Sequence, residues 1–194
     1  MGGSFVEAAG TRPAIRRRAG DWDMVLQPGI LTDHAGKKLN DATYLTTPVV
    51  NTGGLEFTIY RGGVGEVVAK LFGMQDILVG DVEFDRMFIC KGNDEKRLCE
   101  VFSDARLKSL MLGTPGLVLT LCCLRPDRLD TFLRGVVHEF LPGMAADMEA
   151  AIREKLQCYC EGILNDAAAI KRMFEIFELL LPRLAQLGIA RPPT

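Results

Sequence analysis

Apolar and polar side chains alternate most clearly in residues 55–61, LEFTIYR, with a period of two that is typical of a strand with one buried face. The run before it, ATYLTTPVV at 42–50, is rich in β-formers, and the NTGG between the two runs favours a hairpin turn. Pro48 lacks a backbone N–H, so this first strand is expected at a sheet edge or a bulge. The pattern therefore predicts a β-hairpin.

A glycine-rich stretch at 62–65 follows the second strand. It leads into residues 64–72, whose apolar side chains fall at i, i+3, i+4, i+7 and i+8, the spacing of a short amphipathic helix. A phosphate-binding loop would need Gly-Lys-Ser/Thr, but Lys70 lies more than one turn beyond the last glycine. Glu66 would occupy the first helical turn, where its charge repels a phosphate. We therefore interpret the glycines as a turn.

The middle of the chain predicts a strand over 83–92, EFDRMFICKG, and then two short helices over 93–102 and 104–112, each preceded or started by Asn, Asp or Ser. In residues 117–124, LVLTLCCL, apolar side chains occupy both the odd and the even positions, which indicates a central strand covered on both faces. Residues 125–143 show no clear pattern.

Residues 144–163 fit two structures. A helical stripe runs through the whole segment, yet Leu156, Cys158 and Cys160 also alternate as a strand would. The periodicity alone leaves both interpretations open.

The last segment carries the longest helical pattern, beginning after Asp166. Pro182 is expected to kink or loosen its last turn and Gly188 to end it. Ile176 and Leu179 widen the apolar face, which suits a buried core helix or, alternatively, a homodimer interface. The main stripe consists of Ile170, Met173, Phe174, Phe177, Leu180, Leu181 and Leu184.

Hairpins mixed with helices, without strict βαβ alternation, predict an α+β fold. We expect a mainly antiparallel sheet packed by a long C-terminal helix and several short helices, in a single domain over 41–188. Residues 1–40 are a poorly patterned N-terminal segment and residues 189–194 a tail. Within 1–40, Trp22 and its apolar neighbours could form an anchoring patch, and the run Arg16–Arg18 is interpreted as a solvated arm.

Composition narrows the class of protein. Apolar residues make up 48% of the 194 residues and charged residues 25%, which suits a globular chain, and the net charge of −2 argues against a nucleic-acid partner. No apolar run reaches the roughly 18–20 residues needed to span a bilayer, and the first residues lack the features of a secretory signal. A cytoplasmic location is the expectation.

Residues that often carry chemistry are sparse. The six cysteines lie within apolar runs and suit buried structural thiols, because C-C and C-x-C spacings lack the usual zinc-binding pattern. The two histidines, His34 and His138, have no recognisable nucleophile motif around them. We therefore expect neither a bound metal nor a cofactor.

One acidic segment is the exception. Four carboxylates lie within ten positions, and three of them would share one face of the expected strand, where they could bind a divalent cation or act as acid and base. Alternatively they are solvated, or hydrogen-bond to their own turns. The candidate site consists of Asp76, Asp81, Glu83 and Asp85.

The segments FTIYRGGVGEVVAKLFGMQDILVGDVEFDRMFICKGND, DARLKSLML and CEGILNDAAAIKRMFEIFELLLPRLAQLG together resemble a family of uncharacterised bacterial proteins. The resemblance covers 55–188, departs most at 125–154 and matches 1–40 only loosely. It implies a strand at 154–161 leading into the final helix, with an earlier helix only in GMAADMEAAIR. It implies no activity, substrate or catalytic residue.

These observations favour a non-enzymatic binding or assembly module of a bacterial cell, acting through its surface or a pocket between sheet and helices. The expected partner is a protein, including a second copy of the chain. The alternative is a small-molecule or divalent-metal-dependent enzyme that uses residues 76–85.

Overall fold

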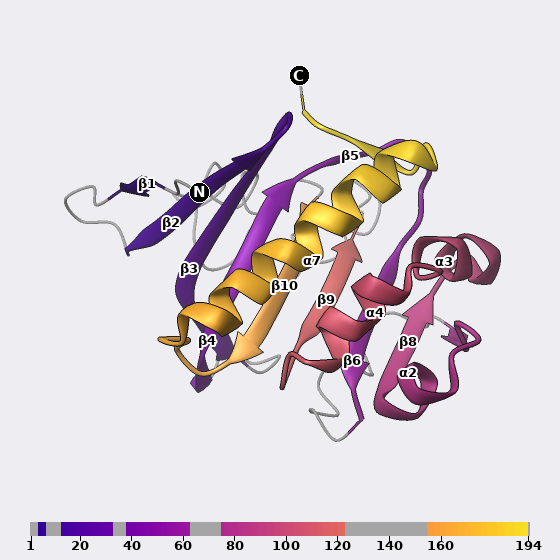
Figure 1. Ribbon diagram of the computed structural model, residues 1–194, viewed down its shortest axis with the longest axis horizontal. Coiled ribbons are helices and arrows are strands. Elements are labelled where there is room, and N and C mark those ends of the chain that lie inside the picture. Colours follow the sequence, from indigo (N-terminus) through magenta and orange to yellow (C-terminus); the bar gives the residue numbers. More distant parts are fainter. Residues whose placement is uncertain (1–3, 7–12, 33–37, 63–74, 123–154, 194) are drawn as a thin grey trace, which may run out of the picture.

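The computed structural model describes residues 4–6, 13–32, 38–62, 75–122 and 155–193. Nine strands form one sheet in the order β1-β2-β3-β4-β10-β9-β6-β8-β7, and every neighbouring pair is antiparallel (Figure 1). The strands are β1 Ser4–Val6, β2 Ala14–Ala19, β3 Trp22–Thr32, β4 Lys38–Pro48, β6 Phe57–Arg61, β7 Gln75–Ile77, β8 Phe88–Gly92, β9 Val118–Cys122 and β10 Lys155–Glu161.

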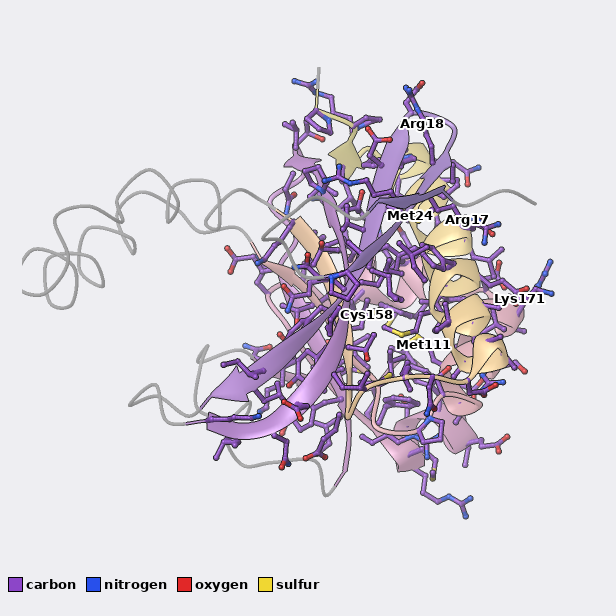
Figure 2. All side chains as sticks on the ribbon, turned by 90° about the vertical axis from the view of Figure 1, so that its left-hand side faces the viewer. Arg17, Arg18, Met24, Met111, Cys158 and Lys171 are labelled. Atoms are coloured by element: carbon purple, nitrogen blue, oxygen red, sulfur yellow. The ribbon has the colours of Figure 1, made fainter. Side chains whose placement is uncertain are left out.

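The described helices lie on one face of this sheet (Figures 1 and 2). They are α2 Val82–Met87, α3 Glu95–Val101, α4 Ala105–Leu112 and the long α7 Ala167–Gln186. The opposite face is called the far face below. The expected α+β architecture, with a long C-terminal helix on an antiparallel sheet, is thereby confirmed.

The core lies between the helices and the sheet. One buried cross-strand row from five neighbouring strands faces the helices, and the apolar stripe of α7 is buried on this side of the sheet. Burial of this stripe stabilises α7 far more than its intrinsic helix propensity does. The row consists of Leu45, Cys158, Leu119, Ile59 and Cys90.

Local signals set the helix ends as expected. Asp94, Asp104 and Asp166 are the N-caps of α3, α4 and α7, and each carboxylate accepts a hydrogen bond from a backbone N–H of the first turn. At the other end of α7, Gly188 has φ +65°, a conformation that glycine adopts without strain, and the helix ends there as predicted.

The expected hairpin between residues 42–50 and 55–61 is wrong. β4 and β6 are separated in the sheet by β10 and β9, which come from much later in the chain. The NTGG segment instead begins with the last residue of β5 Val50–Asn51, which pairs with β11 Ala190–Arg191 in the expected tail. β4 is also an interior strand rather than an edge, and Pro48 is tolerated as its last residue.

The expected strand over 83–92 is half wrong. Residues 82–87 form α2, and the strand β8 begins only at Phe88. Asp81 caps the helix by accepting from the Phe84 N–H, and the rings of Phe84 and Phe88, four residues apart, stack at 4.8 Å. These two contacts outweigh the period-two pattern that the sequence shows.

Residues 14–32, for which the sequence pattern assigned no element, form the hairpin β2–β3 in the same sheet. A two-residue Gly20-Asp21 turn joins the strands, and Gly20 has φ +58°, as the first position of a type II′ turn requires. Trp22, Met24 and Leu26 are buried, so the anchoring patch is confirmed. Arg16–Arg18 belongs to a paired strand rather than to a solvated arm.

Two other predicted strands are confirmed, whereas two predicted helices fall on residues that the structure does not describe. β9 is the central strand that residues 117–124 indicated, and β10 is the strand that the resemblance implied at 154–161. The expected helices at 64–72 and 143–153 lie outside the described residues, as does most of the glycine-rich stretch.

Candidate functional site

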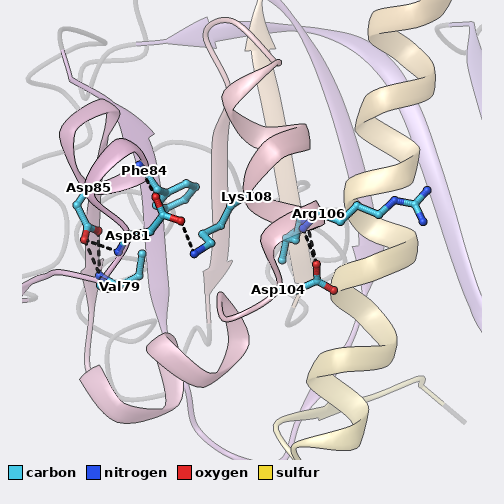
Figure 3. Close-up of polar contacts among 9 residues, drawn as sticks. Val79, Asp81, Phe84, Asp85, Asp104, Arg106 and Lys108 are labelled. Carbon is cyan, nitrogen blue, oxygen red and sulfur yellow. Dashed lines mark hydrogen bonds and ion pairs between the residues drawn. The ribbon is translucent and has the colours of Figure 1, made fainter.

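Asp81 serves the local structure of the acidic segment. Its carboxylate accepts from the Phe84 N–H at 3.1 Å and forms an ion pair with the Lys108 Nζ at 2.6 Å, which ties α2 to α4 (Figure 3). The hydrogen bond from Lys108, followed by that from Phe84, holds the pKa of Asp81 below its ordinary value. The aspartate is therefore kept ionised for its structural contacts.

Asp85 binds the loop that precedes α2. Its two carboxylate oxygens accept from three successive backbone N–H groups, those of Val79 at 2.9 Å, Gly80 at 3.0 Å and Asp81 at 3.1 Å (Figure 3). Gly80, with φ +83°, lets the chain turn around the carboxylate. The Asp85 carboxylate is thus the anion that these three N–H groups of the loop bind.

The other two acidic residues lie apart from this loop's hydrogen bonds. Asp76, on the edge strand β7, pairs with the Lys91 Nζ at 2.7 Å, and this bond raises the pKa of Lys91. Glu83 is exposed in the first turn of α2, where its charge favours the helix dipole. The four candidates therefore belong to three separate arrangements, and no cluster of three or more metal-ligating side chains exists among the described residues.

The described thiols are free and mostly buried. Burial raises the pKa of Cys90 to about 12 and that of Cys160 to about 11, and it raises the pKa of the fully enclosed Cys158 as well. Cys99 is half-buried; its Sγ donates to the Leu78 carbonyl oxygen at 3.4 Å, and burial also raises its pKa. A thiol with a raised pKa is a poor nucleophile at neutral pH.

The chain's three tyrosines lie in one cross-strand row of the far face. Tyr44, Tyr159 and Tyr60 are joined in register through Val118, and the first two rings are 5.4 Å apart. Burial raises the pKa of Tyr44, and burial followed by the neighbouring Tyr44 and Glu161 raises the pKa of Tyr159 to about 12. The phenols of Tyr44 and Tyr159 therefore stay protonated at neutral pH.

Tyr44 also covers the edge of β3. β2 pairs with β3 only as far as Leu26, so residues 27–32 of β3 have a partner on one side among the described strands. The Tyr44 ring crosses Gly29, where an added Cβ would lie 2.5 Å from ring carbon Cε2, and its hydroxyl donates to the Ile30 carbonyl oxygen at 3.1 Å. Pro28 in this stretch has no N–H to offer another strand.

A hollow of about 350 Å³ opens between the β2–β3 turn and the C-terminal part of α7. We call it the Trp22 hollow. Trp22, the only tryptophan of the chain, is 6% exposed, and its indole N–H has no acceptor among the described residues. The lining residues are Ala19, Gly20, Asp21 and Trp22 from the turn and Phe177, Glu178, Leu181 and Pro182 from α7.

An arginine of β2 fixes the hairpin to α7 beside this hollow. Arg17 forms an ion pair with Glu178 at 2.6 Å, and its guanidinium lies over the Phe174 ring at 5.4 Å. Figure 2 shows Arg17 next to α7. Both charged side chains of this pair are less than a third exposed, so the pair holds the two walls in register.

A second hollow, of about 590 Å³, lies on the other side of Pro182 between α7 and the turn from α3 to α4. Arg183 lies in its wall and donates through Nη2 to the Glu100 carbonyl oxygen at 2.9 Å and to the Ser103 Oγ at 3.0 Å. Through these two bonds Arg183 joins α7 to the α3–α4 turn, while Asp104 in the same wall caps α4.

Comparison with protein-family models, with curated proteins and with solved structures gives no match for this chain. The resemblance to a family of uncharacterised bacterial proteins therefore stays a prediction. Of the helices that the structure describes, none is long and apolar enough to cross a membrane.

Sequence reasoning identified Trp22 as a packing residue and Pro182 as a helix irregularity, but it did not bring them together. The Trp22 hollow is built from residues 19–22 and 177–182, which lie far apart in the sequence. The available signals were the single tryptophan directly after a Gly-Asp turn and a proline inside the last helix.

Proposed function

We propose that this protein is a non-enzymatic binding module that takes a side chain of a protein partner into the Trp22 hollow. The observation that carries the proposal is the hollow itself, which lies between the sheet's N-terminal hairpin and α7. Its volume of about 350 Å³ falls in the range of roughly 300–1,000 Å³ that is usual for binding sites.

The lining favours binding over catalysis. It combines apolar residues with the carboxylates of Asp21 and Glu178, and the described residues that line the hollow include no serine, cysteine, histidine or lysine. The exposed surface of the hollow comes from Ala19, Gly20, Asp21, Glu178 and Pro182 and from the edge of Trp22, while Phe177 and Leu181 form its fully buried floor. The Arg17–Glu178 pair keeps the walls together, so little order must be gained on binding.

The enzymatic alternative, with residues 76–85 as its site, has less support. The carboxylates of Asp81 and Asp85 already accept hydrogen bonds from backbone N–H groups. Asp81 is also paired with Lys108, and Asp76 is paired with Lys91. A substrate or a cation would have to displace these contacts first.

A displayed library of random peptides tests the proposal. It is selected on the wild-type chain and counter-selected on Ala19→Leu, a change that extends a side chain into the hollow from the end of β2. Ala168→Leu, at an exposed position in the first turn of α7, adds the same three carbons away from the hollow and is the matched control. We expect peptides that bind the wild type and Ala168→Leu but not Ala19→Leu.

Two results would overturn the proposal. One is a selection in which no enriched peptide distinguishes Ala19→Leu from the control. The other is a rise in melting temperature with Mg²⁺, Mn²⁺ or Ca²⁺ that Asp81→Asn abolishes, because a ligand that binds only the folded state stabilises it. The second result would favour the enzymatic alternative.

A further inference from the structure

The edge of the sheet at β7 carries the most exposed apolar side chains. Leu78 is 70% exposed and Val82 is 88% exposed, the two largest fractions among the large apolar side chains that the structure describes. A single exposed apolar side chain is ordinary, whereas several at one place indicate an interaction surface.

The local fold brings these side chains together. Continuing the antiparallel register of β7 and β8 by one residue places Leu78 opposite Ile89, which is 37% exposed. Leu78 and Val82 flank the turn that the Asp85 carboxylate closes by accepting from the three successive N–H groups between them. We call Leu78, Val82 and Ile89 the edge patch.

The backbone of β7 has a strand partner on one side only. β7 is the last strand in the sheet order and pairs only with β8 among the described strands, and Gln75 and Asp76 are exposed. The outward N–H and C=O groups of such an edge can pair with another strand. A strand of three residues offers few of these groups, so the edge patch would supply much of the affinity.

The charges around the edge patch are balanced. Glu83 and Arg86 are exposed on α2, and neither forms an ion pair with another described residue. On the neighbouring strands, Asp76 is already paired with Lys91. A surface with one free acidic and one free basic group is complementary to itself about a two-fold axis, which can bring Glu83 of one copy to Arg86 of the other. The net charge of −2 gives two copies little reason to repel each other.

We propose that the edge patch is the interface through which two copies of this chain associate about a two-fold axis. Leu78, Val82 and Ile89 of the two copies pack on one another at its centre. Around them, Glu83 of each copy lies opposite Arg86 of the other. This surface is separate from the Trp22 hollow, and the inference does not rest on the proposed function.

Such a dimer carries two open hollows. The Trp22 hollow lies beside the β2–β3 turn, near the opposite edge of the sheet from β7. Figure 1 shows α2 and β8 at one side of the molecule and β2 and β3 at the other. Association through β7 therefore leaves both hollows accessible, and a partner with two binding segments can occupy both at once.

Sedimentation velocity over a range of concentrations tests the association. Because the patch is small, we expect a dissociation constant of about 1–100 μM, with monomer below this range. Val82→Glu places like charges across the axis and should raise this constant about tenfold or more. A glutamate in the first turn of α2 favours the helix dipole, so the variant should stay folded.

Ile163→Glu is the matched control. Ile163 is 53% exposed and lies just beyond β10, which β9 and β6 separate from β8. The same change of apolar to acidic side chain is made there, away from the edge patch. We expect this variant to associate as the wild type does.

An exchange of charges tests the two-fold arrangement. Glu83→Arg and Arg86→Glu each place like charges opposite one another, and we expect each to weaken association about threefold or more. The double variant restores opposite charges across the axis, so its dissociation constant should lie within about twofold of the wild-type value.

Three results would overturn the inference. They are a wild type that stays monomeric at about 0.5 mM, an association that Val82→Glu weakens no more than Ile163→Glu does, and a double variant that associates no better than the single ones. The proposed function fails separately, because peptide selection on monomeric Val82→Glu still shows whether the Trp22 hollow binds.

Discussion

Replacing Asp85 by alanine removes the acceptor for three backbone N–H groups in the loop before α2. The bonds to Val79 and Asp81 are partly buried, while the bond to Gly80 is exposed. A hydrogen bond to a charged group contributes a net ~1.5–3 kcal/mol when buried and less when water can replace it. Counting the two partly buried bonds near the lower end, we expect Asp85→Ala to lower the free energy of unfolding by about 3 kcal/mol.

Two matched variants separate charge from structure. Asp85→Asn keeps the shape and one acceptor oxygen, so we expect a smaller loss of about 1–2 kcal/mol. Glu83→Gln removes a charge from the first turn of the same helix, but the side chain is exposed and has no hydrogen-bond partner among the described residues. We expect it to change the free energy of unfolding by only about 0.3 kcal/mol.

Urea unfolding at pH 7, followed by the fluorescence of Trp22, measures these differences. The midpoint should move while the dependence on urea stays constant, because the surface exposed on unfolding is the same. A loss below about 1 kcal/mol for Asp85→Ala would refute the reasoning, since two partly buried N–H groups without their acceptor cannot cost so little. So would a loss for Glu83→Gln as large as that for Asp85→Asn.

Two further predictions concern the sheet. Gly29→Ala places a methyl group 2.5 Å from the Tyr44 ring; we expect a loss of about 1–3 kcal/mol that Tyr44→Ala largely relieves, and additivity in a double-mutant cycle would contradict this contact. The pKa of Cys90 rises from 9.0 to about 12 on folding, so its contribution is complete below pH 9.0 and is lost as the pH rises to about 12. In Cys90→Ala the fall in unfolding free energy over this range should be shallower by about 1.4 kcal/mol per pH unit, and an unchanged slope would refute the burial argument.

The helix caps and the apolar stripe of α7 could be predicted from the sequence because each depends only on neighbouring residues. The aspartate caps of α3, α4 and α7 and the apolar stripe of α7 each depend on residues within a few positions of one another. For the same reason the alternative interpretation of Asp81, as a residue that hydrogen-bonds to its own turn, agrees with the structure. The period-two pattern of residues 83–87 wrongly predicted a strand, because the alternation of apolar and polar residues does not show that Phe84 stacks on Phe88.

The order of the strands in the sheet and the Trp22 hollow could not be predicted from neighbouring residues. The turn composition at NTGG favours pairing of adjacent strands, but nothing local indicates that β9 and β10 lie between β4 and β6. The polar side chains of β2 do not give the apolar alternation that predicts a strand. One of them, Arg17, instead packs on Phe174 and Glu178, which lie more than 150 positions later in the sequence. A site formed by a turn near one end of the sequence and a helix near the other appears only when the chain is folded.

The position of β10 has a consequence for synthesis of the chain. Its neighbours β4 and β9 are complete once residue 122 has been made, yet the strand that joins them comes 33 residues later, from Lys155 to Glu161. At roughly 5–20 residues per second the ribosome needs about 2–7 s for this interval, during which two long strand edges in the middle of the sheet are unpaired. Premature termination before residue 155 is therefore expected to leave the β4 and β9 edges unpaired, and unpaired strand edges favour aggregation over a smaller version of the fold.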